Sequence, residues 1–218
     1  MPAVTGDHYF SPRPESAAPR REIVFSVAGR EYSLVSAGGV FSADRLDPGT
    51  AVLLRKGDLP SADAAGPFLD LGCGYGPITC VLATVAPRAQ VWAVDVNERA
   101  RELTAENAGR IGAAQRVRVA SPDEVPPDVR FAEIWSNPPI RVGKTDLHVL
   151  LERWLPRLAP DGVAWLVVAR YLGGDSLHGW LADAGWQVQR WGSQKGYRVL
   201  RVTRWKDEPP RRPGPIGG

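Results

Sequence analysis

The pattern of apolar and polar positions changes repeatedly along the chain. From residue 67 onward, short runs rich in Val, Ile, Leu, Phe and Trp are separated by longer segments whose apolar residues recur every three or four positions. The short runs predict β-strands, and the longer segments predict amphipathic helices. The expected strands cover 68–72, 90–96, 116–120, 131–137, 163–170, 186–191 and 196–204, and the expected helices cover 77–86, 98–111, 144–159 and 174–185.

This alternation of strands with helices predicts an α/β fold. Strands joined through a helix pair in parallel, so the seven strands should form a mostly parallel sheet with helices on both faces. No helix separates the last two strands, which should therefore form an antiparallel C-terminal hairpin.

The residues before this sheet predict a small β cap followed by a helix. Two short strand-like runs flank a turn at Ala28-Gly29-Arg30, and Asp47-Pro48 is a typical helix start. Both ends of the chain are rich in Pro, Gly and charge, which is typical of poorly ordered extensions. We therefore expect a flexible arm over 1–20, the β cap and its helix over 21–60, the main domain over 61–205 and a disordered tail over 206–218.

The length and hydrophobic content of the chain are enough for one full hydrophobic core, but the net charge does not decide which kind of partner the protein binds. The chain has 218 residues, of which 44% are hydrophobic, and 27 Lys plus Arg against 24 Asp plus Glu give a net charge of +3. Only four of these cations are lysines. The surplus of arginine fits either a coding bias or an RNA-binding surface.

Cysteine usage and hydropathy exclude several classes of protein. Cys73 and Cys80 lack the paired spacing of a zinc site or of a disulfide framework, so no metal is expected and a reducing compartment fits. No apolar run reaches the roughly 18 residues that a membrane span needs, and the N-terminus lacks the apolar segment of a signal peptide. The protein is expected to be cytoplasmic, without a membrane partner.

A glycine-rich stretch, DLGCGYG, joins the strand at 68–72 to the helix that follows. Glycines at this point let the backbone approach a cofactor closely. Gly72, Gly74 and Gly76 have a G-x-G-x-G spacing, which differs from the G-x-G-x-x-G fingerprint of dinucleotide sites. Pro77 also removes an N–H group that a phosphate would use. The loop therefore indicates a cofactor other than a dinucleotide.

Two carboxylates narrow the choice of cofactor. Asp70 lies two residues before the glycines, where it can hold a cationic or amino group. Asp95 ends the next strand, where it can bind the two hydroxyls of a ribose. An adenosine cofactor with a positive, amino-acid-like end fits both carboxylates, and S-adenosylmethionine is such a cofactor.

The strand at 131–137 ends in an asparagine followed by two prolines. Pro138 and Pro139 lack N–H groups and restrict the backbone, so this exit from the strand is stiff and non-helical. Asn137 Oδ1 and the Pro138 carbonyl can then be fixed acceptors for both N–H groups of a planar amine. Such an amine is a poor nucleophile because its lone pair is delocalised, and fixed acceptors favour its transition-state geometry.

The set DLGCGYG, VDV and NPP resembles the class I S-adenosylmethionine-dependent methyltransferases. The resemblance implies a Rossmann-like fold, a catalytic domain over 61–205 and a target nitrogen held at Asn137, Pro138 and Pro139. The cofactor contacts that it implies are Asp70, Gly72, Cys73, Gly74, Gly76, Asp95, Val96 and Asn137.

Further segments resemble the "methyltransferase small" group, which includes the RsmC-type ribosomal RNA guanine-N2 methyltransferases and their single-domain relatives. These segments are HYFSPRP, GGVFS, DPGTAVLL, NPPIRVGK and KGYRVLR, and the resemblance covers roughly residues 8–204. In this group the GVFS and D-x-G-T segments form a cap beside the cofactor pocket. Phe41 and Thr50 are therefore candidate walls of the target or cofactor site.

Some positions depart from the family pattern. Ile140 stands where many members have Tyr, Phe or Trp, which disfavours the DNA-adenine and release-factor-glutamine branches. An acid commonly follows the third strand, but this chain has VASPDE, so either Ser121 or Asp123 must contact the adenine. RsmC-type enzymes also carry a second, degenerate copy of the fold, for which 218 residues leave no room. The exact nucleotide therefore cannot be carried over from them.

The sequence does not decide the roles of several charged and aromatic residues near the expected site. Arg141 and Lys144 follow the prolines and would either contact RNA phosphates or remain solvated. His8 lies beside Tyr9 and Phe10, which could dock the N-terminal arm over the pocket or stack on a base.

The sequence thus predicts an S-adenosylmethionine-dependent N-methyltransferase that acts on a guanine exocyclic amine (N2) of ribosomal RNA, with ribosomal RNA or a ribosomal subunit as its partner. The flipped base would enter between Ile140 and the cap. Two alternatives stay open: methylation of a small molecule or a protein amide, and a cofactor-binding ribosome assembly factor without catalysis.

Overall fold

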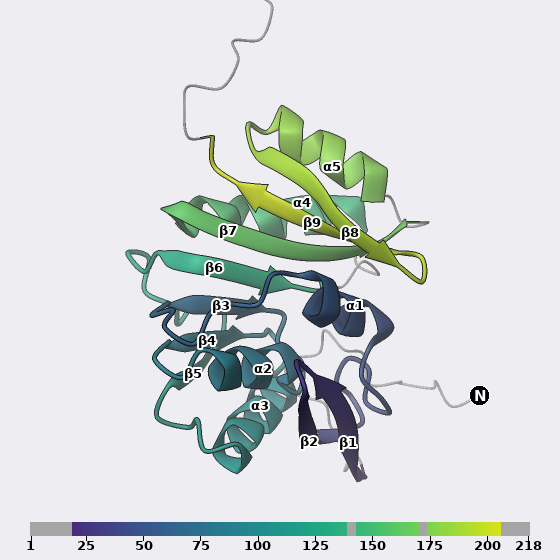
Figure 1. The fold of residues 1–218 in the computed structure, drawn as a ribbon, viewed down its shortest axis with the longest axis vertical. Coiled ribbons are helices and arrows are strands. Elements are labelled where there is room, and N and C mark those ends of the chain that lie inside the picture. The colour runs from purple at the N-terminus through teal and green to yellow at the C-terminus, as the bar shows by residue number, and fades with distance from the viewer. Residues whose placement is uncertain (1–18, 139–142, 171–173, 206–218) are drawn as a thin grey trace, which may run out of the picture.

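The protein is described from a computed structural model, which covers residues 19–138, 143–170 and 174–205. A seven-stranded sheet forms its centre (Figure 1). The predicted arm and tail lie outside the described residues, except for residues 19 and 20 of the arm. The strands of the sheet are β3 (Phe68–Leu71), β4 (Val91–Val94), β5 (Val117–Ala120), β6 (Phe131–Ser136), β7 (Leu158–Ala169), β8 (Gln187–Gln194) and β9 (Tyr197–Thr203).

The sheet is mostly parallel, as predicted. Its strand order is β5-β4-β3-β6-β7-β9-β8, with parallel pairing from β5 to β7 and antiparallel pairing of β9 with both β7 and β8. The chain leaves β5 at one edge and returns to β6 beside β3, so the strand order reverses between β3 and β6. Ligands of such sheets bind at the carboxyl ends of the strands at this point.

Helices cover both faces of the sheet, which confirms the predicted layers (Figure 1). The helices α1, α2 and α3 pack with Trp135 and Trp165 in one hydrophobic cluster, and α4 and α5 pack with Ile134 and Leu200 in another. Their bounds are α1 (Pro48–Lys56), α2 (Pro77–Val85), α3 (Glu98–Arg110), α4 (Lys144–Trp154) and α5 (Gly174–Asp183). No helix in the described part of the chain has the length and apolar character needed to cross a bilayer.

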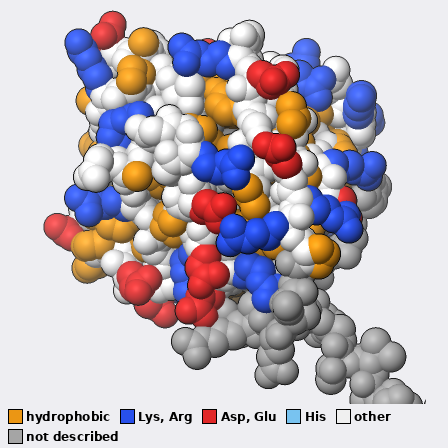
Figure 2. Space-filling model, turned by 90° about the horizontal axis from the view of Figure 1, so that it is seen from below, with side chains coloured by type: hydrophobic (Ala, Val, Ile, Leu, Met, Phe, Trp, Pro, Cys, Tyr) orange, Lys and Arg blue, Asp and Glu red, His pale blue; other side chains and the backbone are white. Residues whose placement is uncertain are grey.

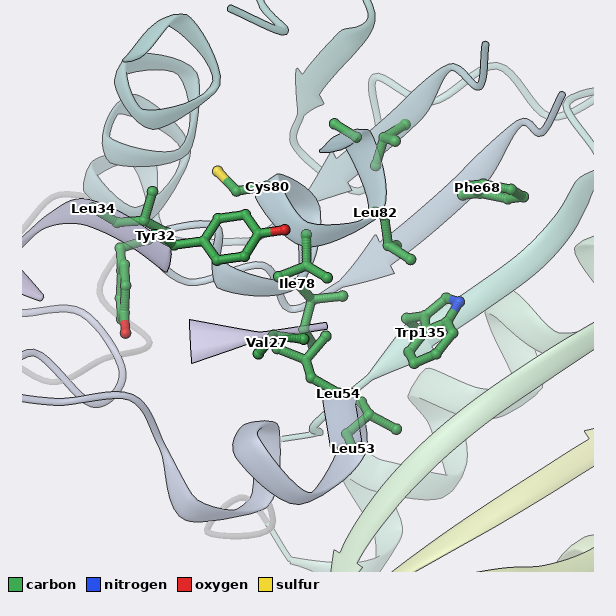
Figure 3. Close-up of a cluster of buried hydrophobic side chains, with 14 of the residues drawn as sticks. Val27, Tyr32, Leu34, Leu53, Leu54, Phe68, Ile78, Cys80, Leu82 and Trp135 are labelled. Atoms are coloured by element: carbon green, nitrogen blue, oxygen red, sulfur yellow. The ribbon is translucent and has the colours of Figure 1, made fainter. Parts of the chain in front are cut away.

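The predicted N-terminal β cap is a hairpin of β1 (Arg20–Val27) and β2 (Arg30–Ala37). Its turn has positive φ angles at Ala28 (51°) and Gly29 (74°), as tight hairpin turns require. In Figure 3, Tyr32 and Leu34 of the hairpin lie beside Ile78 and Cys80 of α2. These side chains belong to the same cluster as α1 and Trp135 of the sheet, so the cap and the sheet share one core.

Asn107 of α3 fastens the cap to the main domain. Its Oδ1 accepts from Val35 N at 2.8 Å, and its Nδ2 donates to the carbonyls of Val35 and Tyr75, both at 2.8 Å. The side chain is buried. A single amide therefore satisfies backbone groups of both β2 and the glycine loop.

The predicted helix over 144–159 is too long. The structure ends α4 at Trp154, adds a short 3-10 helix (Leu155–Arg157) and starts β7 at Leu158. Pro156 explains the difference, because proline lacks the N–H that a continuing α-helix would use. Leu158 is instead buried and pairs with Phe131 of β6.

We expect Asn107→Ala to lower the free energy of unfolding by about 3 kcal/mol, because it leaves buried backbone groups of Val35 and Tyr75 without partners. Urea unfolding measures this loss. Glu102→Ala, at an exposed position of the same helix, should change stability by less than about 0.5 kcal/mol. Equal losses in the two variants would show that the amide does not hold the cap.

Candidate active site

The glycine loop follows β3 directly and has three glycines with positive φ. The φ angles are 78° at Gly72, 58° at Gly74 and 89° at Gly76. A Cβ atom added at Gly72 or Gly74 would meet no atom within 4 Å, whereas one at Gly76 would lie 2.9 Å from Thr104 Oγ1. The first two glycines thus leave open space beside the backbone, and the third allows close packing against α3.

Asp95 joins the glycine loop to the end of β4. Its Oδ2 accepts from Gly74 N at 2.9 Å and its Oδ1 accepts from Asn97 N at 2.9 Å. The residue is only 3% exposed, while the following Val96 is 47% exposed. The carboxylate therefore fixes two loops at the carboxyl edge of the sheet relative to each other.

Asp70 is a fully buried carboxyl group behind the glycine loop. Its Oδ2 accepts from Thr79 N at 2.8 Å and from Thr79 Oγ1 at 2.6 Å, while its Oδ1 has no hydrogen-bond partner. Burial raises the pKa of Asp70 to about 7, against the lowering effect of the Thr79 hydrogen bonds. This orphaned oxygen can still accept a donor or attract a cation.

Asn137 lies at the end of β6, and its side chain contacts the start of α1. Its Nδ2 donates to Asp47 Oδ1 at 2.6 Å and to Thr50 Oγ1 at 3.0 Å. Asp47 is the N-cap of α1 and also accepts from Thr50 N at 2.9 Å. Asn137 Oδ1 accepts no hydrogen bond from the residues that the structure describes.

A cavity lies between Phe41 and Ser42, the start of α1, the glycine loop and Asn137. Phe41 and Thr50, the candidate wall residues, both line it, as does Cys73. Burial raises the pKa of the Cys73 thiol well above its usual value, which disfavours the nucleophilic thiolate form. The described residues that line the cavity are Phe41, Ser42, Asp47, Thr50, Gly72, Cys73, Gly74, Tyr75, Pro77, Ile78 and Asn137.

Other predicted site residues lie away from this cavity or outside the described residues. Ser121 directly follows β5, and its N donates to Glu124 Oε2 at 2.6 Å. The Asp123 side chain is 89% exposed and pairs with Arg153 Nη2 at 2.7 Å. Lys144 is the exposed first residue of α4. Pro138 is buried beside Asn137. The residues that lie outside the described parts of the chain are Pro139, Ile140, Arg141, His8, Tyr9 and Phe10.

Sequence reasoning did not predict five residues of the cavity wall: Ser42, Asp47, Tyr75, Pro77 and Ile78. Asp47 was expected only as a helix start, because its contact with Asn137 spans 90 positions of the sequence. Tyr75 is 2% exposed, and its hydroxyl has no hydrogen-bond partner. In the described parts of the chain, no group of three or more His, Cys, Asp and Glu side chains is arranged to bind a metal ion.

The raised pKa of Asp70 makes stability depend on pH. The carboxyl group ionises near its usual pKa of 3.8 in the unfolded chain and near 7 in the folded protein. Between these values the folded state binds more protons, so the free energy of unfolding falls as the pH rises from about 4 to above 7. We expect Asp70→Asn to flatten this decline in urea unfolding measured across the same range.

Glu133 provides a comparison at a distance from the cavity. Burial raises its pKa to about 7 as well, and it accepts from Trp135 Nε1 at 2.6 Å. Glu133→Gln should therefore flatten the pH dependence independently of Asp70→Asn. If the free energy of unfolding of Asp70→Asn fell with pH as steeply as that of the wild type, the assignment of this pH dependence to Asp70 would be contradicted.

Comparison with protein families gives a match over most of the chain. The family "Methyltransferase small domain" matches residues 31–201. The protein YbxB of Bacillus subtilis (strain 168), which is described as uncharacterized, is 32% identical over 201 residues, covering 91% of this chain and 98% of YbxB. The match with YbxB extends over nearly the full length of both chains.

Ribosomal RNA methyltransferases are also among the similar proteins. "Ribosomal RNA small subunit methyltransferase C" of Alcanivorax borkumensis is 35% identical over 184 residues, covering 83% of this chain and 54% of that protein. A structure titled "T. Thermophilus 16S rRNA N2 G1207 methyltransferase (RsmC) in complex with AdoMet and Guanosine" superposes with a TM-score of 0.68 at 25% identity, covering 89% of this chain and 52% of that chain. The present chain thus spans about half the length of these two proteins.

The site has features that suit S-adenosylmethionine, the cofactor of this family. Gly72 and Gly74 leave open space next to the backbone, and the orphaned oxygen of Asp70 is buried behind the loop and can attract a positive group. Pro77 at the start of α2 leaves no phosphate-binding N–H at that position. The chain belongs to the methyltransferase small domain family and is an S-adenosylmethionine-dependent methyltransferase.

Proposed function

We propose that this enzyme methylates the exocyclic amino group (N2) of a guanine in ribosomal RNA. The observation that carries the proposal is the hydrogen-bond pattern of Asn137. Both hydrogens of its amide nitrogen are taken, one by Asp47 and one by Thr50. The side chain therefore offers a target only its carbonyl oxygen.

An acceptor at this position selects a target that donates a hydrogen bond. If the Asn137 amide also had a free N–H group, it could equally well bind a carbonyl oxygen or a deprotonated oxygen of the target. With only its carbonyl oxygen available, it favours an N–H group of the target. The backbone carbonyl of Pro138 is the second candidate acceptor, because proline has no N–H of its own. Two acceptors suit the two N–H bonds of a primary amine.

The chemistry follows from holding this amine still. The lone pair of an aryl amine is delocalised into its ring, and acceptors on both N–H bonds favour the pyramidal geometry in which the lone pair can attack. When bound, S-adenosylmethionine would supply a methyl group on a cationic sulfur. The target nitrogen would form a bond to the methyl carbon as the carbon–sulfur bond breaks, the sulfur would leave as a neutral thioether, and the positively charged nitrogen would release one proton to water. No general base is needed.

An RNA substrate is supported by the relatives and by the chain itself. Similar proteins bear the name of ribosomal RNA methyltransferases, and one was solved with guanosine. Lys144 at the start of α4 is exposed and follows the Asn-Pro-Pro segment closely, where a cation can contact a phosphate.

The surface formed by β1, β2 and α3 is less suited to RNA. Figure 2 shows the side with β1, β2 and α3, where Lys and Arg side chains are interspersed with Asp and Glu. On these elements Arg20 pairs with Glu106 at 2.9 Å and Arg110 with Glu22 at 3.5 Å. Opposite charges that lie so close weaken the attraction for phosphates. Contacts with RNA are therefore expected near the mouth of the cavity.

Transfer of tritiated methyl groups from S-adenosylmethionine to ribosomal subunits that lack the modification tests the proposal. Nucleoside analysis of the extracted RNA should give labelled N2-methylguanosine. Label in a metabolite or in protein would instead support a small-molecule or protein-amide methyltransferase. Cofactor binding without transfer to any of these would support a ribosome assembly factor without catalysis.

We expect Asn137→Ala to lower methyl transfer by about a hundredfold or more, because the target nitrogen loses a fixed acceptor. Cofactor affinity, measured by calorimetry, should stay within a few fold of the wild type. Equal losses of transfer and of cofactor affinity would contradict the acceptor role.

Asp95→Asn should have the opposite profile. Its carboxylate is our candidate for the ribose hydroxyls, so the dissociation constant of the cofactor should rise by about tenfold or more. At saturating cofactor, the rate of transfer should remain close to that of the wild type. An unchanged dissociation constant would remove Asp95 from the cofactor site.

A further inference from the structure

Asp47, Thr50 and Asn137 form a hydrogen-bonded unit across the cavity, which we name the asparagine clamp. Asp47 Oδ1 receives two hydrogen bonds, from Asn137 Nδ2 at 2.6 Å and from Thr50 N at 2.9 Å. Thr50 Oγ1 receives the other Asn137 hydrogen at 3.0 Å. The clamp joins the start of α1 to the end of β6.

We propose that Asp47 is the positioning residue of this site: its carboxylate fixes the orientation of the Asn137 amide and strengthens the amide carbonyl as an acceptor for the target nitrogen. The role in catalysis rests on the N-methylation proposed above. The role in orientation concerns only the chain's own side chains.

Asp47 decides which end of the Asn137 amide faces the cavity. The two ends of an asparagine amide are similar in size, so packing alone does not choose between them. Turning the amide over would bring Asn137 Oδ1 to the place of Nδ2, against an oxygen of Asp47 that can only accept. The Thr50 hydroxyl can donate as well as accept and would tolerate either orientation. The carboxylate is therefore the group that excludes the wrong one.

The fold holds the Asp47 carboxylate firmly in place. It caps α1, where the N-terminal N–H groups and the helix dipole favour a negative charge. Gly49 provides the space, because a Cβ atom there would lie 2.9 Å from Asp47 Oδ1 and 2.9 Å from Tyr197 Cε1. Thr50 is 4% exposed, so its side of the clamp is shielded from water.

The charge of Asp47 also acts through Asn137. Donation of an N–H bond to a carboxylate shifts electron density toward the amide oxygen, since hydrogen bonds in a chain polarise one another. The target nitrogen becomes positive as it gains the methyl group, and a negative charge behind the acceptor stabilises that change. Asp47 thus contributes most in the transition state, so its loss should lower kcat more than it raises KM.

Nuclear magnetic resonance tests the orientation without any substrate. The chain has only three asparagines, Asn97, Asn107 and Asn137, so selective 15N labelling of asparagine gives three side-chain NH2 pairs. Asp47→Ser retains a good N-cap but removes the charge and is too short to reach Asn137. We expect the Asn137 pair to shift and to lose protection from solvent exchange, while the other two pairs stay unchanged.

Asn97 and Asn107 serve as internal controls for this measurement. Asn97 Nδ2 donates to the Gly39 carbonyl at 2.8 Å, and Asn107 binds Val35, so both report on docking of the cap. Movement of all three pairs would mean that Asp47 only supports the fold. An unchanged Asn137 pair would overturn the proposal as well.

Kinetics tests the catalytic part. Asp47→Asn keeps the size and the helix cap but loses the charge, and we expect kcat to fall by about tenfold or more with KM and cofactor affinity little changed. Arg55→Gly weakens the last turn of the same helix away from the clamp, and it should lower thermal stability but not kcat.

A double-mutant cycle shows whether Asp47 acts through Asn137. Asp47→Asn should cost little in the Asn137→Ala background, because the amide through which it acts is gone. The same loss in both backgrounds would overturn the proposal. Failure of the RNA proposal is separable: a shifted Asn137 pair without methylated RNA supports the orienting role and argues against the substrate, whereas methylated RNA with an unshifted pair argues against Asp47 alone.

Discussion

The parallel pairing of β3 with β6 is the constraint on which the active site depends. Their register places Leu71 beside Ser136, and Ser136 Oγ donates to the Leu71 carbonyl at 2.7 Å, so both strands end level. The next residues, Gly72 and Asn137, therefore both line one cavity although two helices and three strands separate them in the chain. A slip of one residue would turn every side chain of β6 to the other face.

The cap completes a site that the sheet alone leaves open. All three asparagines of the chain bind the segment between residues 35 and 50: Asn107 at Val35, Asn97 at Gly39 and Asn137 at Asp47 and Thr50. An asparagine is suited to this task because a short side chain carries both a donor and an acceptor, and it can pair with backbone or capping groups. The glycine loop, the end of β6 and the cap are thus joined by side-chain amides as well as by the shared hydrophobic cluster.

The architecture could be predicted from local sequence patterns, whereas the asparagine clamp could not. Glycine spacing, the strand-helix alternation and the hairpin turn each depend on neighbouring residues, so the sheet, the layers and the cap followed from the sequence. Pro156 is a local signal against a continuous helix, because proline lacks an N–H group. The predicted helix nevertheless extends through it, since the apolar periodicity of the segment continues past this residue. The contact of Asp47 with Asn137 depends on how two elements that are distant in the sequence meet, and no local sequence pattern predicts it.

The choice between Ser121 and Asp123 as the adenine contact also depends on the tertiary structure. Asp123 is exposed and pairs with Arg153, which favours Ser121 for this contact.

The electrostatic character of the cavity agrees with the proposed transfer of a methyl group to nitrogen without a general base. Among the described residues, its lining contains no Lys, Arg or His, and it combines the Asp47 carboxylate with the carbonyl oxygen of Asn137. Asp95 accepts a hydrogen bond from Gly74 N, and the Asp70 carboxyl group is buried behind the same loop, so these two acidic side chains contribute a negative potential at the glycine loop. Such a potential favours a cationic cofactor and a nitrogen that becomes positive, and it disfavours an anionic nucleophile. In the proposed reaction, the methylated nitrogen would be a strong acid and would lose its proton to water once the bond had formed. The remaining task of the protein would be to hold acceptors in place beforehand.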